Sequence, residues 1–222
     1  QELTKVATDT SIRVVIIAAN GPAFCAGHDM RQLRANPNFD YYKDTFSTSS
    51  QIMKTIMTMP QPVIARVHGM ATAAGCQLVA TCDLAVASTA AKFATPGVHI
   101  GLFCSTPMVA LSRNVSRKAA MEMLMLGDAV DAERALELGL INKVVEPNEL
   151  DAALRVMTDT LLGKSSITLA MGKAAFYEQL EKGVADAYAH TGEVMARNMM
   201  TADATEGIDA FIQKRTPVWT GA

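Results

Sequence analysis

Two stretches of the chain, residues 14–30 and 63–78, repeat one order of features. An apolar run rich in β-branched residues leads into a loop of small residues with glycine, and the pattern of a helix start follows. Small residues let the backbone approach a ligand closely, and glycine accepts positive φ angles. A helix start also presents N–H groups without partners and the positive end of a dipole. Two such starts that converge on one point would hold negative charge developing on an oxygen atom.

The apolar runs lack polar alternation, which predicts strands covered on both faces and therefore an α/β architecture. The expected strands are residues 11–19, 63–67, 83–88 and, as a short one, 92–94. Helical patterns are found at residues 1–8, 29–34, 40–59 and 74–82. We expect residues 96–104 to form a loop with weak strand character, and helices to dominate from residue 107 onward.

The helical pattern of the last third predicts two regions, a core of residues 1–162 and a helical C-terminal region of residues 163–222. The second region carries apolar stripes that include Phe176 and Tyr188, and they exceed what so small a region can bury on itself. Two alternatives remain open at this point. The stripes pack either against the core of the same chain or against another subunit.

Composition excludes several classes of protein. Half of the 222 residues are hydrophobic, 19% are charged and the net charge is −2, so the basic excess of a nucleic-acid-binding protein is missing. The apolar runs are too short to cross a bilayer, and no signal-peptide pattern follows Gln1. We therefore expect no nucleic-acid partner and no membrane insertion. The expected compartment is the cytoplasm for a bacterial source and the mitochondrial matrix for a eukaryotic one.

The four cysteines lie in apolar surroundings without the CxxC spacing of zinc or redox sites. They are therefore expected to be buried, reduced thiols. The sequence also lacks a phosphate-binding P-loop, a dinucleotide fingerprint and a cluster of metal ligands. We expect no metal and no permanently bound cofactor. The cysteines are Cys25, Cys76, Cys82 and Cys104.

Several blocks, in order along almost the whole chain, resemble the crotonase family of enoyl-CoA hydratases and isomerases, and three further blocks resemble one branch of it. The resemblance implies a spiral of ββα turns with a C-terminal helical trimerisation region, assembled as a homotrimer or a dimer of trimers. The family's opening strand has no counterpart in this sequence. The family blocks are AFCAGHDM (23–30), VHGMATAAGCQL (67–78), CDLAVA (82–87), FATP (93–96), LGD (126–128), AERALELGLIN (132–142) and EGIDAF (206–211); those of the branch are 71–80, 101–107 and 213–219.

The resemblance implies an acyl-CoA thioester as partner, with coenzyme A as part of the substrate. The family's oxyanion hole uses two backbone N–H groups, which fall on His28 and Ala74. These are the two helix starts identified above, so the imidazole of His28 is expected to be a bystander rather than a base. The resemblance also implies coenzyme A contacts, for which the candidates are Ala26, Asp29, Met30, Arg31 and Lys214, with Arg215 beside the last.

The chain departs from the family at both catalytic acids. The two glutamates that add water across the double bond correspond here to Gln77 and Gly97. A carboxamide does not exchange protons near neutral pH, and glycine has no side chain. Ser105 occupies a region where some isomerase relatives carry an aspartate, so the residues do not support that alternative either. Efficient hydration by two glutamates is therefore not expected.

Two side chains near Gly97 are candidates for other chemistry. His99 is the better general base, because imidazole takes up a proton near neutral pH, although a loop histidine bonded to backbone is the simpler interpretation. Cys104 is expected to be packing rather than a nucleophile. Three functions stay open: a weak or altered hydratase or isomerase, a non-catalytic acyl-CoA-binding or regulatory protein, and an acyl-CoA hydrolase. The third lacks a convincing Ser–His pair.

Overall fold

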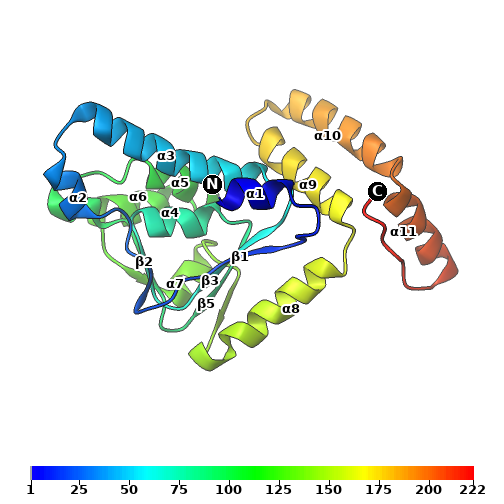
Figure 1. Ribbon diagram of the computed structural model, residues 1–222, viewed down its shortest axis with the longest axis horizontal. Coiled ribbons are helices and arrows are strands. Elements are labelled where there is room, and N and C mark those ends of the chain that lie inside the picture. The colour runs from blue at the N-terminus through cyan, green and yellow to red at the C-terminus, as the bar shows by residue number, and fades with distance from the viewer. Residues whose placement is uncertain (1) are drawn as a thin grey trace. The chain divides into compact units, whose positions relative to one another are not determined.

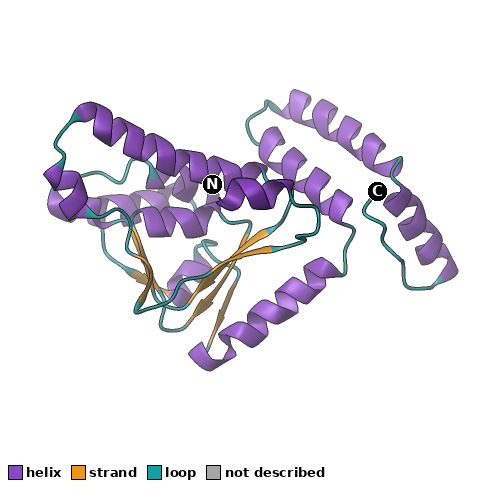
Figure 2. Cartoon of the chain, in the orientation of Figure 1, coloured by secondary structure: helices purple, strands orange, loops and turns teal. Residues whose placement is uncertain are grey.

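A computed structural model describes residues 2–222, so the Gln1 end of the first predicted helix lies outside the described residues. Strands and helices alternate up to residue 145, and helices follow (Figures 1 and 2). The helices are α1 Glu2–Thr8, α2 Met30–Ala35, α3 Phe39–Thr58, α4 Ala74–Thr81, α5 Pro107–Asn114, α6 Arg117–Leu126, α7 Ala132–Glu137, α8 Leu150–Leu162, α9 Ser166–Gln179, α10 Val184–Met199 and α11 Ala202–Gln213, with short 3₁₀ helices η1 Pro96–Ile100 and η2 Pro147–Glu149. The strands are β1 Val15–Ile17, β2 Ala23–Cys25, β3 Val63–Val67, β4 Met70–Thr72, β5 Leu84–Ser88, β6 Lys92–Ala94, β7 Val130–Asp131 and β8 Lys143–Val145.

The strands form two four-stranded sheets, ordered β1-β3-β5-β8 and β2-β4-β6-β7. Neighbours in the first sheet pair in parallel from β3 onward, with Ala65 opposite Ala85 and Ala87 opposite Val144. In the second sheet β2, β4 and β6 are parallel and β7 is antiparallel. Up to β6, successive strands alternate between the two sheets, and a helix follows each pair. This is the repeat of two strands and a helix that the sequence predicts.

Strands β3 and β5 are the most deeply buried strands, whereas the wholly apolar β1 is only half-buried, with Ile16 43% exposed. All of β3 except half-buried Arg66 is buried, and so is all of β5 except Leu84. Pairing in parallel, they form the middle of the first sheet. Helix α4 lies in the same unit and packs against α5. Strands β3 and β5 therefore form the middle of the expected α/β core.

Some element predictions were wrong. The strand expected at residues 11–19 is reduced to β1, because the Asp9 carboxylate accepts hydrogen bonds from the N–H and hydroxyl of Ser11 and holds a turn there. Residues 96–104 begin with the 3₁₀ helix η1 rather than an extended loop. Strands β2 and β4 lie inside the predicted glycine loops, and β7 and β8 interrupt the predicted helices.

The chain divides into two compact units. The larger comprises residues 16–56 and 63–156, and the smaller comprises residues 2–15, 57–62 and 157–222. In the smaller unit α9, α10 and α11 pack against one another. They nevertheless leave many large apolar side chains exposed, among them Phe176, Leu180, Val184, Tyr188, Met195, Met200, Phe211 and Ile212.

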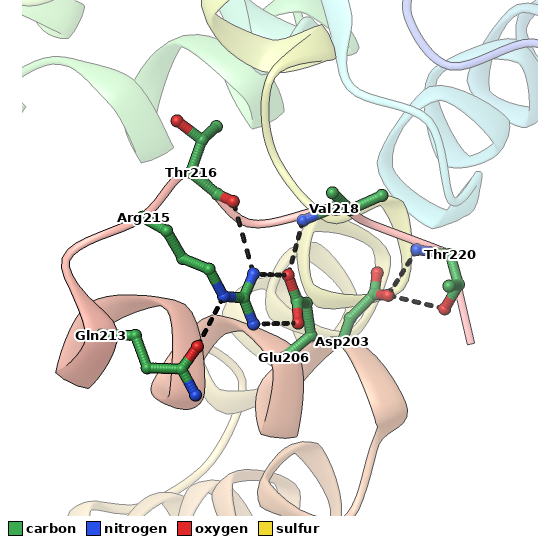
Figure 3. A network of polar contacts seen from close by, with 7 residues as sticks. All are labelled: Asp203, Glu206, Gln213, Arg215, Thr216, Val218 and Thr220. Atoms are coloured by element: carbon green, nitrogen blue, oxygen red, sulfur yellow. Dashed lines mark hydrogen bonds and ion pairs between the residues drawn. The ribbon is translucent and has the colours of Figure 1, made fainter.

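A network of polar contacts fixes the segment after α11 (Figure 3). The Glu206 carboxylate accepts two hydrogen bonds from the Arg215 guanidinium, at 2.6 and 2.7 Å, and one from the Val218 N–H at 2.7 Å. These hydrogen bonds lower the pKa of Glu206 to about 2. Asp203 is buried and accepts from the N–H and hydroxyl of Thr220 at 2.7 and 2.8 Å. Burial raises the pKa of Asp203, but its hydrogen bonds outweigh that effect and lower it.

Candidate active site

A cavity of about 450 Å³ lies within the larger unit, where the two predicted glycine loops meet the segment after β6. Most of the side chains around it are apolar. Its walls come from the β2–α2 loop, α2, α3, the β4–α4 loop and residues 96–107. The residues that line it are Ala26, His28, Met30, Leu33, Phe46, Thr72, Ala73, Ala74, Pro96, Gly97, His99, Ile100, Leu102, Phe103, Cys104, Ser105, Thr106 and Pro107.

The two loops converge at His28 and Ala74. Gly27 has a φ of +86°, and a Cβ added to it would lie 3.4 Å from the Ala74 nitrogen and 3.2 Å from the Ala73 Cβ. Within residues 2–222, neither the His28 N–H nor the Ala74 N–H donates a hydrogen bond to a backbone or side-chain acceptor. Two unpaired donors therefore stand at adjoining loops on the wall of one cavity. Such a pair can donate two hydrogen bonds to a single oxygen atom.

Backbone strain lies directly before one of these donors. Ala73 has a φ of 52° and a ψ of −115°, which is unfavourable for a residue with a Cβ. Its conformation is held by two hydrogen bonds, from its N–H to the Ala94 carbonyl at 2.9 Å and from the Gln77 N–H to its carbonyl at 3.0 Å. Strained residues of this kind cost about 1–3 kcal/mol and gather at functional sites. The strain at Ala73 sets the direction of the Ala74 N–H.

A close backbone approach brings α4 to the first loop. A Cβ added to Gly75 would lie 2.1 Å from the Cys25 carbonyl oxygen and 2.8 Å from the Cys25 Cβ. No larger residue fits there without moving the backbone. Gly75 therefore explains why the second loop carries a glycine at the helix start: it lets the first turn of α4 reach β2.

Gly97 lies in a closed turn. Its carbonyl accepts a hydrogen bond from the Leu102 N–H at 2.9 Å, and Gly101 adopts a φ of 74° within the turn. A Cβ added to Gly97 would lie 2.8 Å from the Leu102 carbonyl oxygen and 3.0 Å from the Cys104 Sγ. The space that a side chain of residue 97 would need is thus taken by the Leu102 carbonyl. The turn has no room for an acid at this position.

Gln77, at the position of the first expected acid, lies on α4 and is only 5% exposed. It does not line the cavity, although it is three residues after Ala74, which does. Its Oε1 is buried and has no hydrogen-bond partner among the described residues. A buried acceptor in this condition is uncommon in folded proteins.

The histidines on the cavity wall have different surroundings. The His28 ring is half-buried and packs edge-on against Phe46, with ring centroids 5.3 Å apart and an interplanar angle of 82°. His99 is exposed, and its ring lies over the C-terminus of α6, where a Cβ added to Gly127 would lie 2.9 Å from the His99 Nε2. Neither forms a hydrogen bond with another described residue. Ser105 donates its hydroxyl to the Phe103 carbonyl.

The cysteines are free thiols, as predicted, and three of the four are buried; Cys25 is half-buried. Burial, with a smaller contribution from Cys104, raises the pKa of Cys76 to about 12. Cys76 therefore stays a neutral thiol and is inert as a nucleophile. Among residues 2–222 no three histidine, cysteine or acidic side chains gather as a metal would require.

The candidate coenzyme A contacts belong to both units of the chain. Ala26 and Met30 line the cavity. The Asp29 carboxylate instead caps α2, accepting from the N–H of Arg31 at 2.8 Å, and the Arg31 side chain is exposed. Lys214 ends α11 in the smaller unit with a φ of 53°. Its neighbour Arg215 is already held by Glu206, as described above.

Comparison with known proteins gives one consistent result. The family model described as "Enoyl-CoA hydratase/isomerase" matches residues 1–222. A Xenopus laevis relative named "Enoyl-CoA hydratase domain-containing protein 3, mitochondrial" is 49% identical over 96% of this chain and 73% of its own. This is the branch that the three further sequence blocks resemble. No helix in the described part of the chain is both long enough and apolar enough to span a membrane.

Two solved structures show the same fold. An enoyl-CoA hydratase from Mycobacterium smegmatis is 53% identical, with a TM-score of 0.97 over 98% of this chain and 85% of its own. The human enoyl-CoA hydratase domain-containing protein 3 is 48% identical, with a TM-score of 0.92 over 96% of this chain and 84% of its own. The expected α/β spiral fold is thereby confirmed.

Proposed function

Because this chain belongs to the enoyl-CoA hydratase/isomerase family, we propose that it binds acyl-CoA thioesters in the cavity described above. The thioester oxygen accepts hydrogen bonds from the N–H groups of His28 and Ala74. The adjoining positions of these donors, their lack of other partners within the described residues and the strain at Ala73 support this assignment. One oxyanion donor contributes roughly 3 kcal/mol to stabilising developing charge. Two such donors grip and polarise the carbonyl.

The bound thioester is not hydrated efficiently. A general acid or base contributes about 10²–10⁴ in rate, and both positions expected to supply one lack a carboxylate. The observation that carries this conclusion is the turn at Gly97, where the Leu102 carbonyl stands 2.8 Å from the place of a Cβ. Gln77 supplies an acceptor that does not exchange protons. The exposed ring of His99 has no hydrogen-bond partner among residues 2–222 that would orient it as a replacement base.

A non-catalytic, acyl-CoA-binding role is the second candidate, and the same two positions favour it. The cavity keeps both N–H donors, so the thioester is recognised even if nothing turns over. A hydrolase finds less support, since Ser105 donates to a backbone carbonyl rather than to a histidine. The first two functions differ in one measurable property, which is residual turnover.

The assembly that we propose is a homotrimer or a dimer of trimers. The exposed apolar side chains of α9, α10 and α11 support it, because faces of this kind are normally covered in an oligomer. For the compartment we propose the cytoplasm if the source is bacterial and the mitochondrial matrix if it is eukaryotic. Relatives whose names include "mitochondrial" support the second option. Light scattering at micromolar concentration should give a mass of three or six times the 23.7 kDa chain mass. A monomer would contradict the proposed assembly.

Binding and turnover measured on the same preparation test the proposal. Calorimetry should detect butyryl-CoA binding, and crotonyl-CoA hydration followed by absorbance should stay at or near background. Ala74→Pro removes one donor and should abolish the preference for the thioester over free coenzyme A, whereas Ala90→Pro, at an exposed turn position, gives a matched proline control. Hydration at about 10 s⁻¹ or faster, the rate of an ordinary enzyme, would overturn the conclusion on catalysis. Equal binding of thioester and free coenzyme A by the unmodified protein would overturn the thioester site.

A further inference from the structure

The two N–H donors of the proposed thioester site are held by different means. The Ala74 N–H follows Ala73, whose strained backbone is fixed by two main-chain hydrogen bonds. Among residues 2–222, by contrast, no main-chain hydrogen bond involves His28, and the residue before it is Gly27 with a φ of +86°. Glycine has more backbone freedom than any other residue. The main chain alone therefore does not fix the direction of the His28 N–H.

The helix that follows His28 does not fix this direction either. Helix α2 has six residues, and none of them is buried. Its first turn is capped by the Asp29 carboxylate, which accepts from the N–H groups of Arg31 and Gln32 at 2.8 and 3.2 Å. Such a cap defines where a helix begins, but it does not place the helix against other elements. Contacts from another element must hold α2 and His28 at the cavity wall.

Those contacts come from one face of α3. Phe46 packs edge-on against the His28 ring, with ring centroids 5.3 Å apart and an interplanar angle of 82°. One turn earlier, the Tyr42 hydroxyl donates a hydrogen bond to the Leu33 carbonyl of α2 at 3.2 Å. Residues four apart lie on the same side of a helix, so the two contacts are neighbours. Helix α3 is itself anchored by buried side chains in its second half, and it can therefore serve as a fixed support.

We propose that Phe46 is a positioning residue, which acts through the His28 ring to direct the His28 N–H toward the thioester oxygen. This inference rests on the proposed function, because the direction of the donor matters only if a thioester is bound. Phe46 and His28 both line the cavity, so their contact lies at its wall, beside the donor. An edge-on aromatic pair has a preferred geometry, which an aliphatic side chain does not impose. The imidazole is thus the part of residue 28 that α3 holds in place.

The test measures the carbonyl stretching band of bound butyryl-CoA, labelled with carbon-13 at the thioester carbon, by infrared difference spectroscopy. Hydrogen bonds to a carbonyl oxygen lower its stretching frequency, so the band reports on the donors rather than on packing in general. In the unmodified protein the band should lie below that of the free thioester. Phe46→Leu should remove about half of this shift, since one of two donors loses its direction. Phe39→Leu makes the same change at the exposed first residue of α3 and should keep the full shift.

Two further variants test whether Phe46 acts through the His28 ring. Phe46→Tyr keeps the aromatic ring and should keep the full shift. His28→Ala keeps the N–H and removes the imidazole, so it should lose as much of the shift as Phe46→Leu does. The double variant should lose no more than either single one, because both changes remove the same contact. Calorimetry should show, for each variant without the ring pair, a ratio of butyryl-CoA affinity to free coenzyme A affinity that is lower by about threefold or more.

Each outcome decides a separate point. A full shift in Phe46→Leu would overturn the inference and leave thioester binding intact; Phe46 would then be only a wall of the cavity. Additive losses in the double variant would overturn the action through His28. A band of the unmodified protein at the frequency of the free thioester, or no binding of butyryl-CoA, would overturn the proposed function itself. Should Phe46→Leu fail to fold, His28→Ala carries the same prediction, and a full shift in that variant would contradict the inference.

Discussion

The turn around Gly97 makes a strong prediction about a single methyl group. In Gly97→Ala the new Cβ would lie 2.8 Å from the Leu102 carbonyl oxygen and 3.0 Å from the Cys104 Sγ. The first contact is with main chain that is fixed by the Leu102 N–H bond to the Gly97 carbonyl at 2.9 Å. The backbone of Gly97 is not left-handed, so the effect comes from the contact and not from a strained φ.

The expected loss of stability is that of overpacking, about 1–3 kcal/mol. For a chain of this length 1 kcal/mol corresponds to about 2–4 °C in melting temperature, so Gly97→Ala should melt roughly 2–12 °C below the unmodified protein. Thermal melts followed by circular dichroism, at one fixed protein concentration because assembly affects the midpoint, give this value. Affinity for butyryl-CoA should fall together with stability, because the displaced turn lines the cavity.

A matched control separates steric conflict from the general effect of adding a methyl group. Gly172 lies inside α9 with nothing within 4 Å of its Cβ position. Gly172→Ala should therefore raise the melting temperature, because alanine is more favourable than glycine in a helix interior. A melting temperature of Gly97→Ala within 1 °C of the unmodified protein would refute the reasoning. Any side chain at residue 97 would clash with the Leu102 carbonyl in the same way. The double substitution Gln77→Glu with Gly97→Glu therefore cannot form a two-glutamate site in this turn.

Two further predictions concern charge. Hydrogen bonds from Arg215 and Val218 lower the pKa of Glu206 to about 2 from an ordinary 4.5, so its ionised form stabilises the fold above pH 4.5 and this contribution is lost as the pH falls toward 2. Glu206→Gln should therefore melt below the unmodified protein at pH 7, with a difference that shrinks between pH 4.5 and 2; a difference independent of pH would contradict the assignment. Second, no lysine or arginine of the described chain lines the cavity, so an acyl group ending in a carboxylate would be buried without a countercharge. Competition binding should place adipoyl-CoA at least tenfold weaker than hexanoyl-CoA, and equal affinities would show that the charge stays in solvent.

The parts of the fold that were predictable from sequence are those with a strong local signal. The β3 and β5 strands are largely apolar runs of four or five residues without polar alternation, and Gly75 and Gly27 mark the turns where backbones meet. The convergence of two helix starts could therefore be predicted. The short strands β2 and β4 could not, because three residues such as Ala-Phe-Cys carry no periodicity and pair only with segments distant in sequence.

Some features of the candidate site could not be predicted from the sequence. Alanine seldom adopts a positive φ, so the residue type gives no sign of the backbone conformation at Ala73. The sequence shows Gln77 and Gly97 at the two positions where acids were expected, but it does not show the surroundings of these residues. The Leu102 carbonyl lies close to Gly97 because the chain closes a turn there, and Gln77 Oε1 has no donor among residues 2–222 because of how distant segments pack around it. No pattern within a single segment encodes either fact.

The order β1-β3-β5-β8 of the first sheet is also the order in which a ribosome synthesises these strands. Each newly made strand therefore meets a sheet edge that is already formed, and closing the long intervening loop limits the rate of docking. One edge of the growing sheet is always β1, and the other edge at any moment is the strand that was made last. For β5 this exposure lasts while residues 89–142 are translated, so that interval is when a nascent chain is most prone to pair with a neighbouring one.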